Sequence, residues 1–251
     1  MSTFVQQDSI VRRIWGDSDV VLFIFAGSAA EFALNKAVDW LYFTGKLPSD
    51  PLGRLFSTVA YAHRIIFADT DTAHKAIDAM AAIHGAVEQN RGAKIPDWAY
   101  RDVLYMLIDY SIAAYEVLER KLTGDEKEEV YNVFFRMGSR MGLKELPPTY
   151  ETWLPDRHAH MREDLVYNQY TPDLFLQYKK HLGVVRYHIL LQVQAILAHG
   201  QVARLLKFKP GKAFGVLLST YGKIRHLVIA RWARALLLPP AYKDQIAALN
   251  K

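Results

Sequence analysis

One histidine of the sequence stands on an apolar helical stripe, where its imidazole could bind a metal ion. Ala73, Ile77, Met80, His84 and Val87 follow one another at spacings of four, three, four and three residues. A helix places residues with this spacing on one face, so His84 is expected to point where the apolar side chains point. The stripe is therefore the first candidate site in the chain.

Small residues surround His84 in the sequence, namely Ala81, Ala82, Gly85 and Ala86. They leave room for a flat, wide group against the helix. The proximal histidine of a b-type haem needs this setting, because the macrocycle requires space and an apolar wall beside a neutral imidazole. The alternative is a core histidine satisfied by protein groups, and the helical spacing alone favours that interpretation.

The preceding segment carries a second set of polar residues on one face. Arg54, Thr58, Tyr61 and Ile65 are spaced four, three and four residues apart. Arg54 would lie in the first turn of a helix, where its guanidinium could grip a carboxylate such as a haem propionate. The alternative is a solvated surface arginine. Thr58 could donate to a bound ligand or only to a carbonyl of its own helix.

Asp109 stands in an apolar stretch that includes Leu107, Ile108 and Ile112. A carboxylate in such a place needs a partner, because burying an unpaired charge is costly. It could orient the imidazole of His84 from behind. The favoured alternative is a structural salt bridge or a cap to another helix.

Helix start and stop signals recur at helix-sized intervals, and alternation typical of strands is scarce. Asp50 caps a helix that opens with Pro51, Thr123 and Glu126 form a capping box, and Gly92 ends a helix. The predicted helices cover residues 20–34, 51–68, 72–91, 98–121, 124–141, 150–167, 172–182, 184–199, 200–208 and 213–238. These patterns predict one all-α domain of eight to ten helices over residues 1–251.

The composition excludes several chemistries. The chain has no cysteine, so it has no disulfide, no thiolate-bound zinc or iron–sulfur cluster, no thiol nucleophile, and neither c-type nor thiolate-ligated haem. Lys and Arg number 31 against 26 Asp and Glu, a net charge of +5. This modest excess, without a nucleic-acid-binding motif, does not indicate a nucleic-acid partner.

The sequence contains neither a recognisable secretory signal nor a membrane span. The first residues have no basic region followed by an apolar one. The longest apolar stretch, residues 20–34, is interrupted by Ser28 and Glu31 and indicates a buried core helix. We expect a cytoplasmic protein.

A polar segment near residue 160 could be interpreted as a metal site. It contains His158, His160, Glu163 and Asp164. Residues two apart on a helix point in different directions, whereas His160 and Asp164 share a face. The chain lacks the Glu-x-x-His pairs of di-iron bundles and the His-Glu-x-x-His motif. The favoured interpretation of residues 156–164 is a solvated polar helix.

The last third of the chain is basic and amphipathic. One interpretation is a helix that lies on a membrane surface and delivers a lipid-like substrate. The favoured alternative is a C-terminal core helix with a solvated basic face. The basic residues are Lys207, Lys209, Lys212, Lys223, Arg225, Arg231 and Arg234, with Trp232 among the apolar residues between them.

Several short motifs together resemble a known family. Residues 50–58, 66–68 and 83–87 carry the strongest likeness, and Leu107-Ile108-Asp109, Tyr115-Glu116 and residues 237–240 extend it. Gly16-Asp17 and residues 26–29 match the entry to the first core helix of the family. In order and spacing, from about residue 12 to residue 240, the chain resembles the catalytic domain of bacterial rubber oxygenases (latex clearing proteins) and of the oxygenase of the mycophenolic-acid pathway.

The resemblance implies an all-α fold around a haem pocket, non-covalent haem b, and cleavage of carbon–carbon double bonds by dioxygen in a small apolar, isoprenoid-like substrate. His84 matches the axial iron ligand of the family, and Arg54 and Thr58 match its Arg and Thr near the haem. The predicted catalytic residues are Arg54, Ser57 and Thr58. The predicted haem contacts are His84, Arg54, Thr58, Met80 and Asp109, with His84 on the iron.

Two positions depart from the family pattern. Ser57 stands where rubber oxygenases carry a lysine that caps the distal side of the haem, and Leu104 stands where many relatives have a histidine. Three hypotheses follow: a haem-dependent oxygenase, a haem carrier or sensor without turnover, and a haem-free helical interaction domain. Dioxygen consumption separates the first two, and haem binding separates both from the third.

Overall fold

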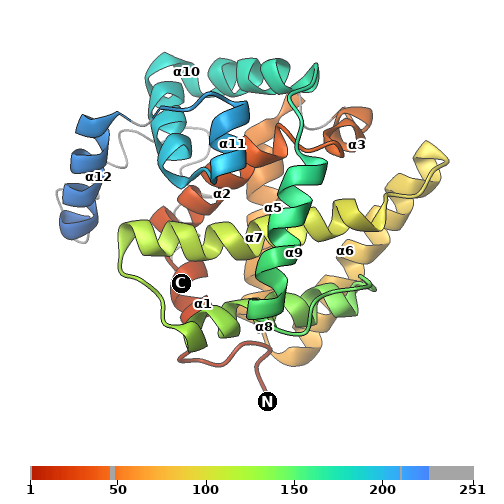
Figure 1. Ribbon diagram of the computed structural model, residues 1–251. Helices are drawn as coiled ribbons and strands as arrows, with labels where there is room; N and C mark the ends of the chain where they lie inside the picture. Colours follow the sequence, from red (N-terminus) through yellow and green to blue (C-terminus); the bar gives the residue numbers. More distant parts are fainter. Residues whose placement is uncertain (1, 46–48, 210, 226–251) are drawn as a thin grey trace.

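Two apolar helices cross at the centre of the molecule, α2 (Ser18–Phe32) and α7 (Asp97–Leu118). The carboxylate of Asp17 caps α2 by accepting from the backbone N–H groups of Asp19 and Val20. Gly27 permits the close crossing, because a Cβ atom at this position would overlap the ring of Tyr110. The two helices thus supply surfaces on which several of the others pack (Figure 1).

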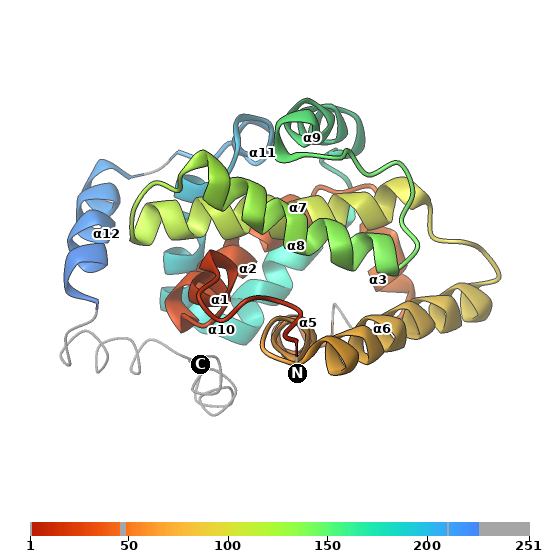
Figure 2. The same cartoon turned by 90° about the horizontal axis from the view of Figure 1, so that it is seen from below.

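The computed structural model describes residues 2–45, 49–209 and 211–225, and in these ranges the regular structure is entirely helical. The prediction of a single all-α domain is confirmed. Around α2 and α7 lie α1 (Ile10–Trp15), α3 (Val38–Phe43), α5 (Pro51–Ile66), α6 (Thr70–Arg91), α8 (Gly124–Arg140), α9 (Tyr150–Asp164), α10 (Tyr170–Leu197), α11 (Gly200–Leu205) and α12 (Lys212–Ile224). Figure 2 shows α12 and the outer half of α6 at opposite ends of the molecule.

The main core joins α1, α2, α5, α7 and α8 around large aromatic side chains. Trp15 is fully buried, and its indole N–H donates to the hydroxyl of Ser111 at 3.2 Å. The carbonyl of Trp15 lies 2.7 Å from His63 Nε2, which ties α1 to α5. None of the helices in the described ranges is both long enough and apolar enough to cross a bilayer.

The local signals predicted most helix ends. The capping box of Thr123 and Glu126 is present in both directions, and Gly92 ends α6 in the left-handed conformation with φ 69°. The helices predicted at 172–182 and 184–199 form α10, which Gly183 interrupts at φ 74°. The end of the helix predicted at 213–238 lies outside the described residues.

Two surface expectations are wrong for some of their residues. The α9 segment was predicted to be solvated, yet Arg157 and His160 are buried, whereas His158, Arg162 and Glu163 face solvent as expected. Arg225 was placed on a solvated basic face, yet it is buried and forms ion pairs with Asp17 and Asp19. In each case a partner distant in the sequence compensates the charge. Arg231, Trp232 and Arg234 lie outside the described residues.

The crossing of α2 and α7 makes a prediction about stability. Gly27→Ala should lower the free energy of unfolding by about 1–3 kcal/mol, because the added methyl group overpacks the contact with Tyr110. Gly215→Ala, at a helical position with open space around it, should keep or raise stability. Urea unfolding of both variants measures the difference, and equal stabilities would contradict the close crossing.

Candidate functional site

The α5–α6 hairpin brings Arg54 and His84 to the same end of the molecule. Pro51 opens α5 under the cap of Asp50, and Asp69 caps α6 after a short connection. Arg54 lies one turn into α5 and His84 lies in the second half of α6, so antiparallel pairing places them at the same level. Figure 1 shows the two helices diverging toward this end.

The imidazole of His84 is half-buried and lacks a protein partner at one nitrogen. Its Nδ1 atom is buried and has no hydrogen-bond partner among the described residues. The edge of the Tyr100 ring lies against it, with ring centroids 5.3 Å apart. Burial lowers the pKa of His84, the positive charge of Arg54 lowers it further, and Glu88 opposes the shift. The imidazole is therefore neutral near pH 7 and able to bind a metal ion.

Arg54 is a half-buried cation without a counter-ion in the described part of the chain. Burial lowers the pKa of its guanidinium, and no carboxylate of the described residues lies within ion-pair distance. A guanidinium in this setting favours an anionic ligand, because it offers several charge-assisted donors in a fixed plane. The expectation of a solvated surface arginine does not fit this burial.

Ser57 and Thr58 both donate to the carbonyl of Arg54, at 2.8 and 3.1 Å. Thr58 is half-buried, whereas Ser57 is exposed. Each hydroxyl uses its only proton in a hydrogen bond to the helix backbone, so it can act only as an acceptor toward other groups. The alternative in which Thr58 donates to its own helix carbonyl is the one observed.

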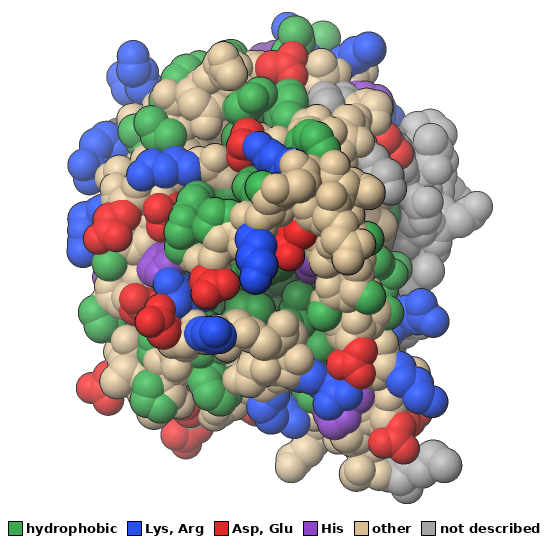
Figure 3. Space-filling view, turned by 90° about the vertical axis from the view of Figure 1, so that its right-hand side faces the viewer, with side chains coloured by type: hydrophobic (Ala, Val, Ile, Leu, Met, Phe, Trp, Pro, Cys, Tyr) green, Lys and Arg blue, Asp and Glu red, His purple; other side chains and the backbone are tan. Residues whose placement is uncertain are grey.

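The rest of the predicted stripe lines the same side of α6. Ala73 and Ile77 are buried, and Met80 is half-buried against the main core. A Cβ atom at Gly85, the residue after His84, would meet nothing within 4 Å. Figure 3 views the molecule from the side that carries the outer ends of α6 and α7, where hydrophobic side chains lie among charged ones.

Two residues near His84 were not predicted from the sequence. Glu88, one turn after His84, accepts from the hydroxyl of Tyr100 at 3.1 Å and from the backbone N–H of Ile95 at 2.9 Å. These bonds fix the ring of Tyr100 against the imidazole. The spacing of His84 and Glu88 was visible in the sequence, but the contribution of Tyr100 from α7 was not.

Asp109 lies in a buried ionic cluster and contacts neither His84 nor Arg54 in the described part of the chain. Arg157 Nε donates to Asp109 at 2.9 Å, and the Nε2 atom of His199 lies 3.0 Å from the same carboxylate. The two terminal nitrogens of Arg157 bind both oxygens of Glu31 at 2.6 Å. The salt-bridge interpretation of Asp109 is therefore the one observed.

The charges of this cluster balance when His199 is protonated. Burial alone disfavours that proton, but Asp109 raises the pKa of His199 above its ordinary value. Burial alone would raise the pKa of Asp109, but His199 and Arg157 hold it well below its usual range. The cluster joins α2, α7, α9 and the start of α11 in one polar contact.

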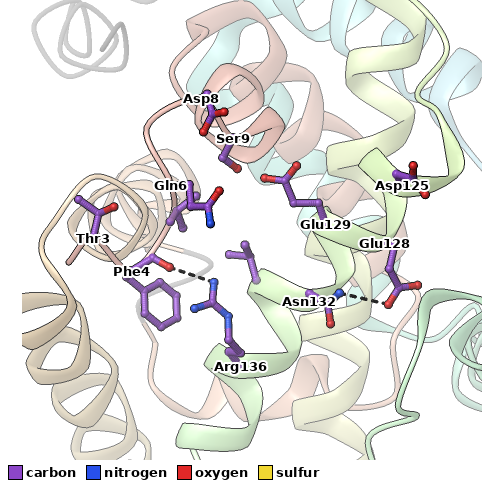
Figure 4. Close-up of a pocket in the computed structure, with 12 residues that line it drawn as sticks. Thr3, Phe4, Gln6, Asp8, Ser9, Asp125, Glu128, Glu129, Asn132 and Arg136 are labelled. Carbon is purple, nitrogen blue, oxygen red and sulfur yellow. Dashed lines mark hydrogen bonds between the residues drawn. The ribbon is translucent and has the colours of Figure 1, made fainter.

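A separate cleft of about 530 Å³ lies between the N-terminal segment and α8. Its lining is acidic, with Asp8, Asp125 and Glu129 around it, while Arg136 stacks on the ring of Phe4 (Figure 4). Arg136 also donates to the carbonyl of Phe4 at 2.9 Å. None of the predicted site residues lines this cleft.

Residues 12–246 match the family model described as "ER-bound oxygenase mpaB/B'/Rubber oxygenase, catalytic domain". The match includes the α5–α6 hairpin and both of its central residues, Arg54 and His84. No curated protein and no solved structure matches the chain.

The buried ionic cluster makes a prediction about stability. Glu31→Gln should lower the free energy of unfolding by about 3–5 kcal/mol, because Arg157 keeps its buried charge and loses its bidentate partner. The double variant Glu31→Leu, Arg157→Met should lose less than the two single changes together. Arg120→Met, which breaks the exposed pair with Glu126, should change stability little. Strictly additive losses in urea unfolding would contradict the coupling.

Proposed function

Because the chain belongs to the catalytic-domain family of mpaB-type and rubber oxygenases, we propose that it is a haem-dependent oxygenase. The proposed cofactor is haem b, whose iron His84 would bind, and the proposed substrate is a small apolar, unsaturated molecule. The observation that carries the proposal is the pair of half-buried side chains at the open end of the α5–α6 hairpin. His84 has an unpartnered nitrogen there, and Arg54 has no counter-ion in the described part of the chain.

The residues present fit a haem in three respects. A neutral imidazole with a lowered pKa suits a proximal ligand. The guanidinium of Arg54 suits a propionate. The half-buried Met80 lies one turn before His84 on α6 and offers an apolar contact, and the position of a Cβ atom at Gly85 is open. A core histidine satisfied by protein groups would not leave Nδ1 without a partner.

When bound, the haem supplies the activation of dioxygen that the oxygenase reaction requires. His84 would ligate the iron, and the bond between Glu88 and Tyr100 would limit rotation of the imidazole through the ring contact. Arg54 would bind a propionate and fix the orientation of the group. Thr58 and Ser57 keep acceptor lone pairs, and Met80, which packs against the main core, would help to exclude water from the apolar side.

A haem carrier or sensor is the second candidate, and Ser57 is the observation that favours it. Rubber oxygenases place a lysine at this position over the haem, whereas the Ser57 hydroxyl is exposed and bonded to its own helix. An oxygenase consumes dioxygen and forms an oxidised product with an unsaturated lipid or isoprenoid. A carrier or sensor gives the same haem spectrum without this consumption.

The first prediction concerns the haem ligand. The purified protein, or the protein reconstituted with haemin, should show a Soret band that shifts on reduction with dithionite. His84→Ala should lose or displace this band, whereas His188→Ala, at an exposed histidine of α10, should keep it. A protein that stays colourless after addition of haemin, or a His84→Ala spectrum equal to that of the wild type, would disprove the proposal.

The second prediction concerns Arg54. Arg54→Met should speed the transfer of haem to apomyoglobin by about tenfold or more, because a hydrogen bond to a charged group contributes about 1.5–3 kcal/mol. Arg54→Lys should retain part of the affinity, since the charge stays but the paired donors do not. Arg64→Met, at an exposed arginine of the same helix, is the matched control. Equal transfer rates for the Arg54 and Arg64 variants would exclude a propionate contact.

A further inference from the structure

A histidine and two aspartates meet between α7 and α9, away from the hairpin that carries Arg54 and His84. Asp102 comes from α7, and His160 and Asp164 come from one face of α9. The Nδ1 atom of His160 lies 2.6 Å from Asp102 Oδ1 and 3.5 Å from Asp164 Oδ2. One potential ligand atom from each residue lies within 4.8 Å of the others. The sequence had paired His160 with Asp164, and the fold adds Asp102.

The cluster is shielded from solvent and carries more negative than positive charge. Asp102 is 2% exposed and His160 is 9% exposed. Asp156 adds a third carboxylate, 3.9 Å from His160 Nε2. The positive charges of Arg101 and Lys36 act on the cluster from its rim, and no ion pair joins either of them to Asp102, Asp156 or Asp164 in the described residues.

A hydrogen-bonded ion pair accounts for only part of this arrangement. The single proton on His160 Nδ1 serves Asp102, whose other oxygen accepts from the amide of Asn35 at 2.6 Å. The carboxylate of Asp164 points at the same nitrogen, and no described residue donates a hydrogen bond to it. Asp164 therefore faces the charge of Asp102 without a donor of its own. Burial and this neighbouring charge both raise the pKa of Asp164.

We infer that Asp102, His160 and Asp164 form a binding site for one divalent transition-metal cation. One imidazole nitrogen with two carboxylate oxygens suits Zn²⁺ and its first-row neighbours, whereas Mg²⁺ and Ca²⁺ prefer oxygen alone. The cation would take the place of the Nδ1 proton and neutralise both carboxylates. Water would complete the coordination.

The distances suit such an exchange. Zinc binds nitrogen and carboxylate oxygen at about 2.0–2.2 Å, which places the ligand atoms of a tetrahedral site roughly 3.3 Å apart. The pair of His160 and Asp164 is already at 3.5 Å. The pair of His160 and Asp102, now joined by a hydrogen bond at 2.6 Å, must open by less than about 1 Å. The bond from Asn35 already orients the Asp102 carboxylate, as the partners of metal ligands commonly do.

The consequence would be a metal cross-link between α7 and α9. Asp102 and Asp109 lie on α7, and Arg157 and His160 lie on α9, so the cross-link would stand beside the buried ionic cluster. This site shares no residue with the proposed haem site. The two proposals can therefore be tested independently, and the failure of one does not affect the other.

The test is calorimetric titration of Zn²⁺ into the full chain as purified, without an affinity tag. Asp164→Asn removes the carboxylate that accepts no hydrogen bond from the described residues, and His160→Gln removes the imidazole nitrogen. Glu163→Gln is the matched control, because it removes the same charge from the neighbouring exposed position of α9. His84→Ala separates this site from zinc binding at the hairpin, and circular dichroism confirms that each variant is folded.

We expect one saturable Zn²⁺ site per chain. Its affinity should fall at least about tenfold in Asp164→Asn and in His160→Gln and stay unchanged in Glu163→Gln and His84→Ala. Zn²⁺ should also raise the Tm of the wild type more than that of Asp164→Asn, because a ligand that binds only the folded state stabilises it. Absence of saturable binding to the wild type, or equal affinity in the folded Asp164 and Glu163 variants, would overturn the inference.

Discussion

Arg157 carries a positive charge into the interior, and the arrangement of the central helices follows from how that charge is neutralised. Glu31 on α2 meets both terminal nitrogens of the guanidinium, and Asp109 on α7 meets the third. A buried guanidinium tolerates little displacement of its partners, because each lost bond leaves charge without solvation. Three helices are thus fixed against one another at one point, and His199 extends the contact to the start of α11.

The α5–α6 hairpin differs in how its polar groups are satisfied. In the central cluster Arg157 donates to both Glu31 and Asp109, whereas in the described residues Arg54 has no counter-ion and His84 Nδ1 has no hydrogen-bond partner. Burial without partners is unfavourable, and folded proteins keep it mainly where a ligand supplies the missing interaction. This contrast supports a binding role for Arg54 and His84 and a structural role for Asp109. All three residues had been predicted from the sequence to lie in one site.

Short-range signals in the sequence predicted what depends on neighbours along the chain. The cap of Asp69, the capping box of Thr123 and the left-handed end at Gly92 all follow from residues a few positions apart, as does the shared face of Met80 and His84. The predictions that were wrong concern contacts between residues far apart in the sequence. The buried polar residues of α9 have distant partners: His160 pairs with Asp102, and Arg157 pairs with Glu31. Helical spacing carries no information about pairs so far apart. The same limit hid Tyr100 beside His84.

The contact of Arg225 with Asp17 also bears on the order in which the chain folds. The guanidinium binds the carboxylate that caps α2 across a separation of 208 residues. During synthesis this contact can therefore form only after both residues, 208 positions apart, have left the ribosome. Closing a loop of this size costs only slightly more entropy than closing a loop of half its length. The long separation therefore has little effect on the free energy of the contact. Until the contact forms, the carboxylate of Asp17 can contribute to α2 only as its N-cap, so this one side chain has a local role first and a long-range role afterwards.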